Sequence, residues 1–189
     1  MKPQKHTMDL TTGPVTARLM AFTMPILASN LLQHLYNAAD RAVVGKFAEN
    51  GDIALAAVGS TGSAIMLIVN LVLGLALGAN VVCANMRGAG NQKDLRKAMH
   101  TSILLAIVAG IAAMVLGICV AEPFLLLMGS PETVIKAATL YTRIYFVGVP
   151  FQLIYNFGAS ILRAYGDTKR PMTILAVSGL VNVALNLVF

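Results

Sequence analysis

The chain has 189 residues, of which 57% are hydrophobic and only 12% are charged, and its mean hydropathy is +0.75. A soluble domain needs far more charge to cover its surface, so this composition predicts an integral membrane protein. The net charge of +6 does not indicate nucleic-acid binding, because the basic residues lie between apolar segments and do not form one face or tail.

Five segments are apolar enough to cross a hydrocarbon core, which needs about 20 helical residues. They run approximately over 19–39, 53–84, 98–121, 133–162 and 171–189. The sequence therefore predicts an all-α, polytopic bundle of transmembrane helices. The first span is too long for the apolar core of a cleavable signal peptide, so we expect it to remain in the protein.

The first span carries polar residues on one face, because residues at i, i+3, i+4 and i+7 share a helix face. This stripe consists of Asn30, Gln33, His34, Asn37, Asp40 and Arg41. Asp40 would lie about 33 Å from Arg18 along a helix, close to the outer boundary of a ~30 Å core. Two interpretations stay open: an interfacial carboxylate paired with Arg41 or Lys46, or a carboxyl group inside a cavity. In a cavity, Asp40 could bind a proton reversibly or help amide oxygens to bind a monovalent cation.

Three other spans also carry polar or small residues on one face. These are Ser60, Ser63, Asn70, Gly74 and Gly78 in the second span, Tyr141, Tyr145, Gly148, Gln152 and Tyr155 in the fourth, and Ser178, Asn182 and Asn186 in the fifth. Hydrogen bonding between helices explains a single polar residue in a membrane and is the alternative for each stripe. Four stripes in five helices favour a water-filled central cavity.

Two prolines lie inside predicted spans, Pro25 in the first and Pro150 in the fourth. Each removes a backbone hydrogen bond and predicts a bend in its helix. The bend can act as a hinge or remain a static kink, and the sequence leaves both open.

The distribution of basic residues predicts the orientation, since Lys and Arg are retained on the cytoplasmic side. One side holds ten: Lys2, Lys5, Arg18, Arg87, Lys93, Arg96, Lys97, Arg163, Lys169 and Arg170. The other holds three: Arg41, Lys46 and Lys136. We expect a multi-pass protein of the cytoplasmic membrane with its N-terminus in the cytoplasm. The last span reaches Phe189 inside an apolar run, so we also expect the sequence to be part of a longer chain with at least one more helix.

Catalytic motifs such as HExxH and GxSxG do not occur in the sequence, and it has no paired catalytic acids. We therefore expect no enzyme activity.

Several longer segments follow one another along the chain: MPILASNLLQHLYNAADRAVVGKF, ALAAVGSTG, GLALGANVVCANMRGAGN, YFVGVPFQLIYNFGASILRAYGDTKRPM and VNVALNLVF. Short pieces such as LAAVG are not specific, whereas LYNAAD followed by LRAYGDTKRPM and VNVALN is a more specific set. In order and spacing the segments resemble the first lobe of the multidrug and toxic compound extrusion (MATE) family of cation-coupled efflux transporters.

The resemblance implies twelve helices in two six-helix lobes around a central cavity. This chain would supply helices one to five, and the second lobe would be missing from it. The implied activity is export of organic, cationic drugs or toxic compounds across the membrane in exchange for Na⁺ or H⁺, with no other cofactor.

The family's cation-coupling residues fall on Asp40 and Asn182, and Asn186 stands where many members have an acid. The resemblance thus implies that Asp40, Asn182 and Asn186 are the candidate Na⁺ ligands. An amide at 186 keeps an oxygen but removes a charge, so the site would hold a cation less tightly or rely on Asp40 alone for a proton.

Tyrosine and apolar walls can hold a flat cation through stacking and cation–π contact of about 0.5 to 2 kcal/mol. The expected cavity residues are Asn30, Gln33, His34, Tyr36, Asn37, Ser63, Asn70, Tyr141, Tyr145, Gln152 and Tyr155. Two alternatives remain: a flippase for lipid-linked saccharides, which would need a cavity rich in Arg and Lys, and a structural membrane fragment that does not transport.

Overall fold

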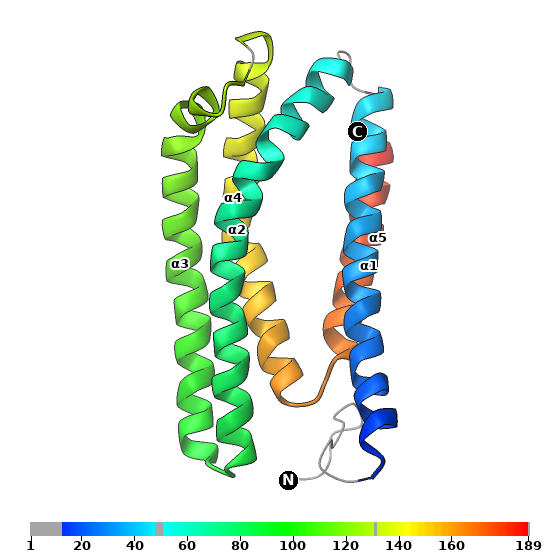
Figure 1. The fold of residues 1–189 in the computed structure, drawn as a ribbon, viewed down its shortest axis with the longest axis vertical. Coiled ribbons are helices and arrows are strands. Elements are labelled where there is room, and N and C mark those ends of the chain that lie inside the picture. The colour runs from blue at the N-terminus through cyan, green and yellow to red at the C-terminus, as the bar shows by residue number, and fades with distance from the viewer. Residues whose placement is uncertain (1–12, 48–50, 131, 189) are drawn as a thin grey trace.

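The computed structural model describes residues 13–47, 51–130 and 132–188, and these residues form helices with no strand among them (Figure 1). The helices are α1 (Val15–Phe47), α2 (Gly51–Gly88), α3 (Gln92–Leu127), α4 (Glu132–Ala164) and α5 (Lys169–Val188). The prediction of an all-α bundle is confirmed.

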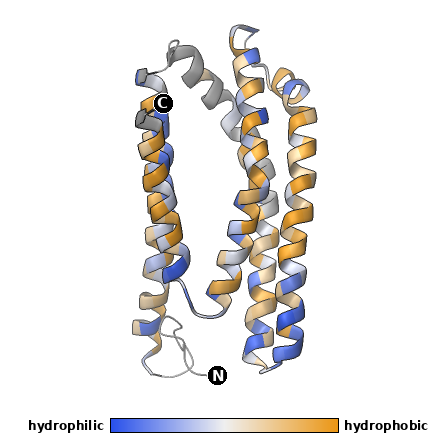
Figure 2. Ribbon diagram, turned by 180° about the vertical axis from the view of Figure 1, so that it is seen from behind, coloured by the Kyte–Doolittle hydropathy of each residue, from blue (hydrophilic) through white to orange (hydrophobic). Residues whose placement is uncertain are grey.

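Three stretches of the described chain are long and apolar enough to cross a membrane: Val15–Val43, Gln92–Leu127 and Glu132–Ala164. Figure 2 shows hydrophobic residues along the middle of α3 and hydrophilic residues gathered where this helix begins. This banding is the pattern expected of helices whose middle lies in hydrocarbon and whose ends reach water.

The helices form two groups (Figure 1). Helices α2, α3 and α4 pack against one another, and α1 pairs mainly with α5 and to a lesser extent with α2. Contacts between α4 and α5 are few. The first and last helices of the described chain are therefore side by side.

The apolar core of the larger group is built around α4. Phe146, Val149, Leu153 and Phe157 are buried there against small residues of α3 and against Ile65 and Ala76 of α2. The buried face of α3 includes Ser102, Ala106, Gly110, Ala113, Gly117 and Ala121. Small residues let two helices approach closely in a membrane, which explains why the third span has a stripe of small residues and no polar stripe.

Short turns connect α2 to α3 and α4 to α5 at the same end of the bundle as the start of α1 (Figure 1). Gly90 and Gly166 have φ of 69° and 77°, which residues with a Cβ rarely adopt. Asp167 is buried after the second of these glycines; its Oδ1 accepts a hydrogen bond from the Arg170 N–H at 3.1 Å and so caps α5.

Basic residues are separated between the two ends of the bundle. The helix ends joined by these turns, with the start of α1, hold Arg18, Arg87, Lys93, Arg96, Lys97, Arg163, Lys169 and Arg170. The other half holds Arg41, Lys46, Lys136 and Arg143, and the last of these pairs with Glu122 of α3 at 3.6 Å. Lys2 and Lys5 lie outside the described residues. The separation in space follows the predicted pattern, and which end faces the cytoplasm stays a prediction.

Candidate functional site

A cavity of about 350 Å³ lies where α1, α2, α4 and α5 meet, toward the end of α1 and the start of α4. It is lined by Asn37, Asp40, Arg41, Val43, Gly62, Ile65, Met66, Tyr141, Tyr145 and Asn182. Five of the residues that we expected at the site are thus brought together: Asp40, Asn182, Asn37, Tyr141 and Tyr145.

The polar side of the cavity comes from the paired helices α1 and α5. Asp40 and Asn37 lie one turn apart on α1, and Asn182 lies on α5. Asp40 is half-buried and is the one acid among the lining residues of the described chain. Together these side chains offer a carboxylate and two amide groups, and oxygen is the ligand that hard cations prefer.

The other side of the cavity is aromatic and apolar. The ring centroids of Tyr141 and Tyr145 lie 6.5 Å apart with an interplanar angle of 38°, and Tyr145 meets Phe146 edge to face at 6.2 Å. Both tyrosines belong to α4, whose buried face anchors it to α3. Such a wall can stack on a planar ligand or attract a cation to the ring faces.

Glycine leaves space on the α2 side of the cavity. A Cβ built on Gly62 would meet no atom within 4 Å. Ile65 and Met66 follow at i+3 and i+4, so all three share a face of α2. These residues and Val43 were not predicted, because nothing in an apolar residue tells a cavity wall from a face toward lipid.

The residues of the polar stripe nearer the start of α1 do not line this cavity. Asn30, Gln33 and His34 are exposed in the described chain. Tyr36 points to α5, where its hydroxyl donates a hydrogen bond to the Ala176 carbonyl oxygen at 3.2 Å. Its contacts join α1 to α5.

Four expected residues on other helices either do not line the cavity or have side chains outside what the structure describes. Asn70 is exposed and Gln152 is half-buried, and neither lines the cavity. The side chains of Ser63 and Asn186 lie outside the described part.

Tyr155 belongs to a different part of the molecule. Its hydroxyl donates to the Pro171 carbonyl oxygen at 3.0 Å, and its ring lines a groove near the α4–α5 turn. The tyrosine stripe of α4 therefore divides between two hollows, one near each end of the helix.

The two prolines differ in their surroundings. Pro25 lies in α1, where its carbonyl oxygen accepts a hydrogen bond from Ser29 Oγ at 2.7 Å. Pro150 lies in α4, and its Cα would be 2.7 Å from a Cβ on Gly110 of α3, so this proline is packed against a neighbouring helix. A third proline, Pro123, lies inside α3 and had not been predicted to bend a helix.

A bundle of apolar helices around a polar hollow defines a class of protein, the polytopic membrane proteins with a cavity between their helices. Within that class, the MatE family model matches residues 25–188, and the chain belongs to this family. The resemblance noted in the sequence is confirmed. The expectation that the chain is not an enzyme agrees with its relatives, which are described as multidrug resistance proteins and transporters.

One relative is the probable multidrug resistance protein YoeA of Bacillus subtilis (strain 168), 32% identical over 164 residues, with 87% of this chain and 35% of YoeA covered. Two similar crystal structures show MATE in the straight and in the bent conformation, with TM-scores of 0.83 and 0.84. Each is 25% identical in sequence and is matched over 94% of this chain and 39% of its own. The chain thus spans somewhat more than a third of the length of these relatives.

Proposed function

We propose that the chain forms the first lobe of a secondary active antiporter, completed by a second lobe of the same polypeptide. The antiporter exports organic, cationic compounds across the cytoplasmic membrane in exchange for Na⁺ or H⁺. The observation that carries this proposal is the common cavity of Asp40, Asn37, Asn182 and the tyrosines Tyr141 and Tyr145.

The coupling step is neutralisation of Asp40. Ionising a carboxylate in a partly desolvated cavity costs free energy, and binding of Na⁺ or H⁺ reduces that cost. The cation shifts the balance between the outward-open and inward-open states only by its difference in affinity for the two. A cationic substrate needs the same carboxylate, so ion and substrate exclude each other and the two movements are coupled.

The chemistry of the cavity suits one monovalent cation. Asp40 supplies one negative charge, and the amide oxygens of Asn37 and Asn182 can supply further ligands. Arg41 also lines the cavity, and its charge lowers the affinity for any cation. Asn186 would add an oxygen without a charge, so Asp40 remains the main electrostatic attraction.

The substrate lies against the tyrosine wall in this proposal. Tyr141 and Tyr145 present their rings to the same hollow as Asp40, so a flat cation can stack while its charge faces the carboxylate. The apolar residues Ile65 and Met66 accept the remainder of the molecule without demanding a particular shape. This arrangement favours a broad range of amphiphilic cations.

Pro25 is the proposed hinge of α1. It lies in the same helix as Asp40, and α1 packs less extensively than the three helices of the larger group. Similar proteins have been crystallised in a straight and a bent conformation, which supports motion in such a bundle. Pro150 packs against Gly110 of α3, so α4 has less freedom to bend at Pro150 than α1 has at Pro25.

The competing flippase needs cations for a pyrophosphate headgroup, and Arg41 is the one basic residue among the lining residues of the described chain. The cavity therefore supports a cationic substrate better than a pyrophosphate.

The test is transport by the complete two-lobed polypeptide in proteoliposomes with an imposed Na⁺ or H⁺ gradient. Asp40→Asn should abolish cation-driven efflux of a fluorescent organic cation while the protein still inserts. Asp94→Asn is the control. Asp94 lies near the start of α3, where it pairs with Lys97 at 3.5 Å in an exposed ion pair. Undiminished efflux in the Asp40 variant would overturn the proposal, and a two-lobed protein that moves only lipid-linked saccharides would favour the flippase.

A further inference from the structure

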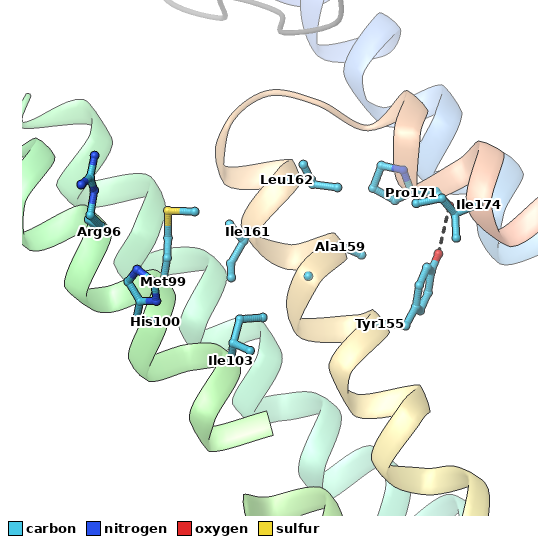
Figure 3. Close-up of a pocket in the computed structure, with 11 residues that line it drawn as sticks. Arg96, Met99, His100, Ile103, Tyr155, Ala159, Ile161, Leu162, Pro171 and Ile174 are labelled. Atoms are coloured by element: carbon cyan, nitrogen blue, oxygen red, sulfur yellow. Dashed lines mark hydrogen bonds between the residues drawn. The ribbon is translucent and has the colours of Figure 1, made fainter. Parts of the chain in front are cut away.

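A second hollow, of about 460 Å³, lies between α3, α4 and α5 near the turn that joins α4 to α5 (Figure 3). Its walls are mostly apolar and include Ile103 of α3, Gly158 and Leu162 of α4, and Ile174 of α5. It lies at the other end of the bundle from the cavity of Asp40, so the proposed exchange of ions and substrate does not explain it. We call this hollow the α3–α5 groove.

Basic residues lie at one margin of the groove. Figure 3 shows Arg96 and His100 on α3, across from Tyr155, Pro171 and Ile174. Both basic side chains are exposed. Neither the groove nor the hollow beside it has a carboxylate among its described lining residues.

The basic margin continues along one face of α3. Lys93, Arg96, Lys97 and His100 follow at i, i+3, i+4 and i+7 and line an adjoining hollow of about 1140 Å³. Lys97 is partly compensated by Asp94, at 3.5 Å in an exposed pair. Arg96 and His100 line both hollows, so the basic surface leads directly into the apolar groove.

Polarity changes with depth along α3. At 1.5 Å per residue, Arg96 lies about 6 Å, His100 about 12 Å and Ile103 about 16 Å from Gln92, where the helix begins. The groove thus passes from charged to apolar over a distance comparable with a lipid headgroup and the first part of its acyl chain. A soluble anion would make no favourable contact with the apolar part of the groove. An uncharged hydrocarbon chain would make none with the basic margin.

The wall beside the basic margin is held in place by several contacts. The Arg87 guanidinium lies 4.9 Å from the centroid of the Tyr165 ring and donates to the Ala164 carbonyl oxygen at 3.1 Å. The Tyr165 hydroxyl donates to Met99 Sδ at 3.4 Å. These contacts tie the end of α4 to α2 and α3, so the α3 and α4 walls of the groove are held in place without a ligand.

We propose that the α3–α5 groove binds an anionic phospholipid of the cytoplasmic leaflet, given the predicted orientation of the chain. The phosphate lies between Arg96 and His100, and an acyl chain runs along Ile103, Gly158 and Ile174. The guanidinium of Arg96 can donate two parallel hydrogen bonds to phosphate oxygens. Basic pockets between membrane helices on the cytoplasmic side are suited to anionic headgroups, and the negative potential of that leaflet concentrates them there.

Gly158 provides a test of the acyl-chain part alone. A Cβ at this position would meet no atom within 4 Å, so a larger side chain can enter the groove without moving the backbone. Gly158→Met should therefore narrow the groove and displace the acyl chain while leaving Arg96 and His100 in place.

The experiment is native mass spectrometry of the complete two-lobed polypeptide titrated with phosphatidylglycerol and, separately, with phosphatidylcholine. Phosphatidylglycerol should bind more tightly, and Arg96→Gln should weaken it about fivefold, since one basic residue near an anionic surface contributes about 1 kcal/mol. Gly158→Met should weaken binding of the same lipid. Lys136→Gln, which removes a basic residue at the opposite end of the bundle, is the matched control and should change nothing.

Three results would overturn the proposal. The first is equal binding of the two lipids, and the second is unchanged phosphatidylglycerol binding by Arg96→Gln. The third is displacement of the lipid by millimolar inorganic phosphate, which would show that the groove's basic margin binds a free anion. Another segment of the polypeptide could fill the groove in place of a lipid. In that case Gly158→Met will lower the unfolding temperature and Arg96→Gln will leave lipid binding unchanged. This outcome also contradicts the proposal.

Discussion

The ring of Tyr36 in α1 lies against Gly179 in α5 so closely that a Cβ on this glycine would overlap the ring. The Tyr36 hydroxyl donates a hydrogen bond to the carbonyl oxygen of Ala176, which lies about one turn before Gly179 in α5. The pairing of the first and last helices therefore depends on a residue without a side chain.

Gly179→Ala should separate α1 from α5. Overpacking costs about 1 to 3 kcal/mol, and the Tyr36 ring has to move or the helices have to part. The measurement is thermal unfolding in detergent. Gly148→Ala is the matched control, because a Cβ there meets no atom within 4 Å and alanine favours a helix by up to about 1 kcal/mol. Equal unfolding temperatures for the two variants would contradict the close contact.

Gly117→Ala should weaken the packing of α3 on α4. A Cβ on Gly117 would overlap the ring of Phe146, which is only 2% exposed and has little room to move. We expect a loss of about 1 to 3 kcal/mol in the free energy of unfolding. Phe146→Leu in the same chain should recover part of this loss, and a double-mutant cycle without coupling would show that the two residues do not share this space.

Gly62→Leu should fill the cavity beside Asp40 without destabilising the helices, because the space around Gly62 is open. Substrate binding to the two-lobed protein should weaken at least tenfold, which corresponds to about 1.4 kcal/mol. Gly59→Leu on the same helix is the control, since that glycine is also open but does not line the cavity. Fluorescence anisotropy with a planar organic cation measures the difference. Equal affinities would mean that the substrate binds elsewhere.

Asp167→Ala should destabilise the α4–α5 turn. The carboxylate caps α5 through the Arg170 N–H, and its Oδ2 lies 3.2 Å from Arg170 Nε. Loss of a cap costs about 0.5 to 2 kcal/mol, and burial of Asp167 puts the expected value at the upper end. Asn91→Ala removes a similar cap at the start of α3, where the hydrogen bond to the Asp94 N–H is exposed. A larger loss for Asn91→Ala in thermal unfolding would contradict the role of burial.

Asn186→Asp tests the proposed cation site. Asn186 follows Asn182 at i+4, on the same side of α5. A second carboxylate should lower the Na⁺ concentration for half-maximal transport at least tenfold, because two opposite charges a few ångströms apart interact by a few kcal/mol even at an effective dielectric constant of about 20. Thr173→Asp, an exposed position near the start of α5 that does not line the cavity, is the control and should leave the Na⁺ dependence unchanged. An unchanged Na⁺ dependence in Asn186→Asp would show that residue 186 does not contact the bound cation.

The fold could be predicted because the physics of a bilayer leaves few choices. A run of about 20 apolar residues in hydrocarbon must satisfy its own backbone hydrogen bonds, and a single helix does so. The observed helices extend past the predicted apolar spans, as α3 does from Gln92 to Leu127. Polar residues at the ends, such as Asn91 and Asp94, support a helix at the interface although they lower the hydropathy.

The candidate site was predicted only in part. Asp40, Asn182 and Tyr141 could be chosen because a polar side chain in a membrane tends to face inward. The placement of Tyr36 and Tyr155 could not, because helical periodicity gives the face of a residue and not the depth or register of the neighbouring helix. Packing between helices decides both, and it depends on small residues such as Gly179.

The pairing of α1 with α5 also has a consequence for biogenesis. A ribosome adds about 5 to 20 residues per second, so α5 emerges on the order of ten seconds after α1. Helices α2, α3 and α4 contact their neighbours in sequence and can assemble as they are made. Helix α1 therefore stays beside the translocon or in lipid until α5, its main partner, has been synthesised. During this time the face with Asn37 and Asp40 lacks its contacts with α5.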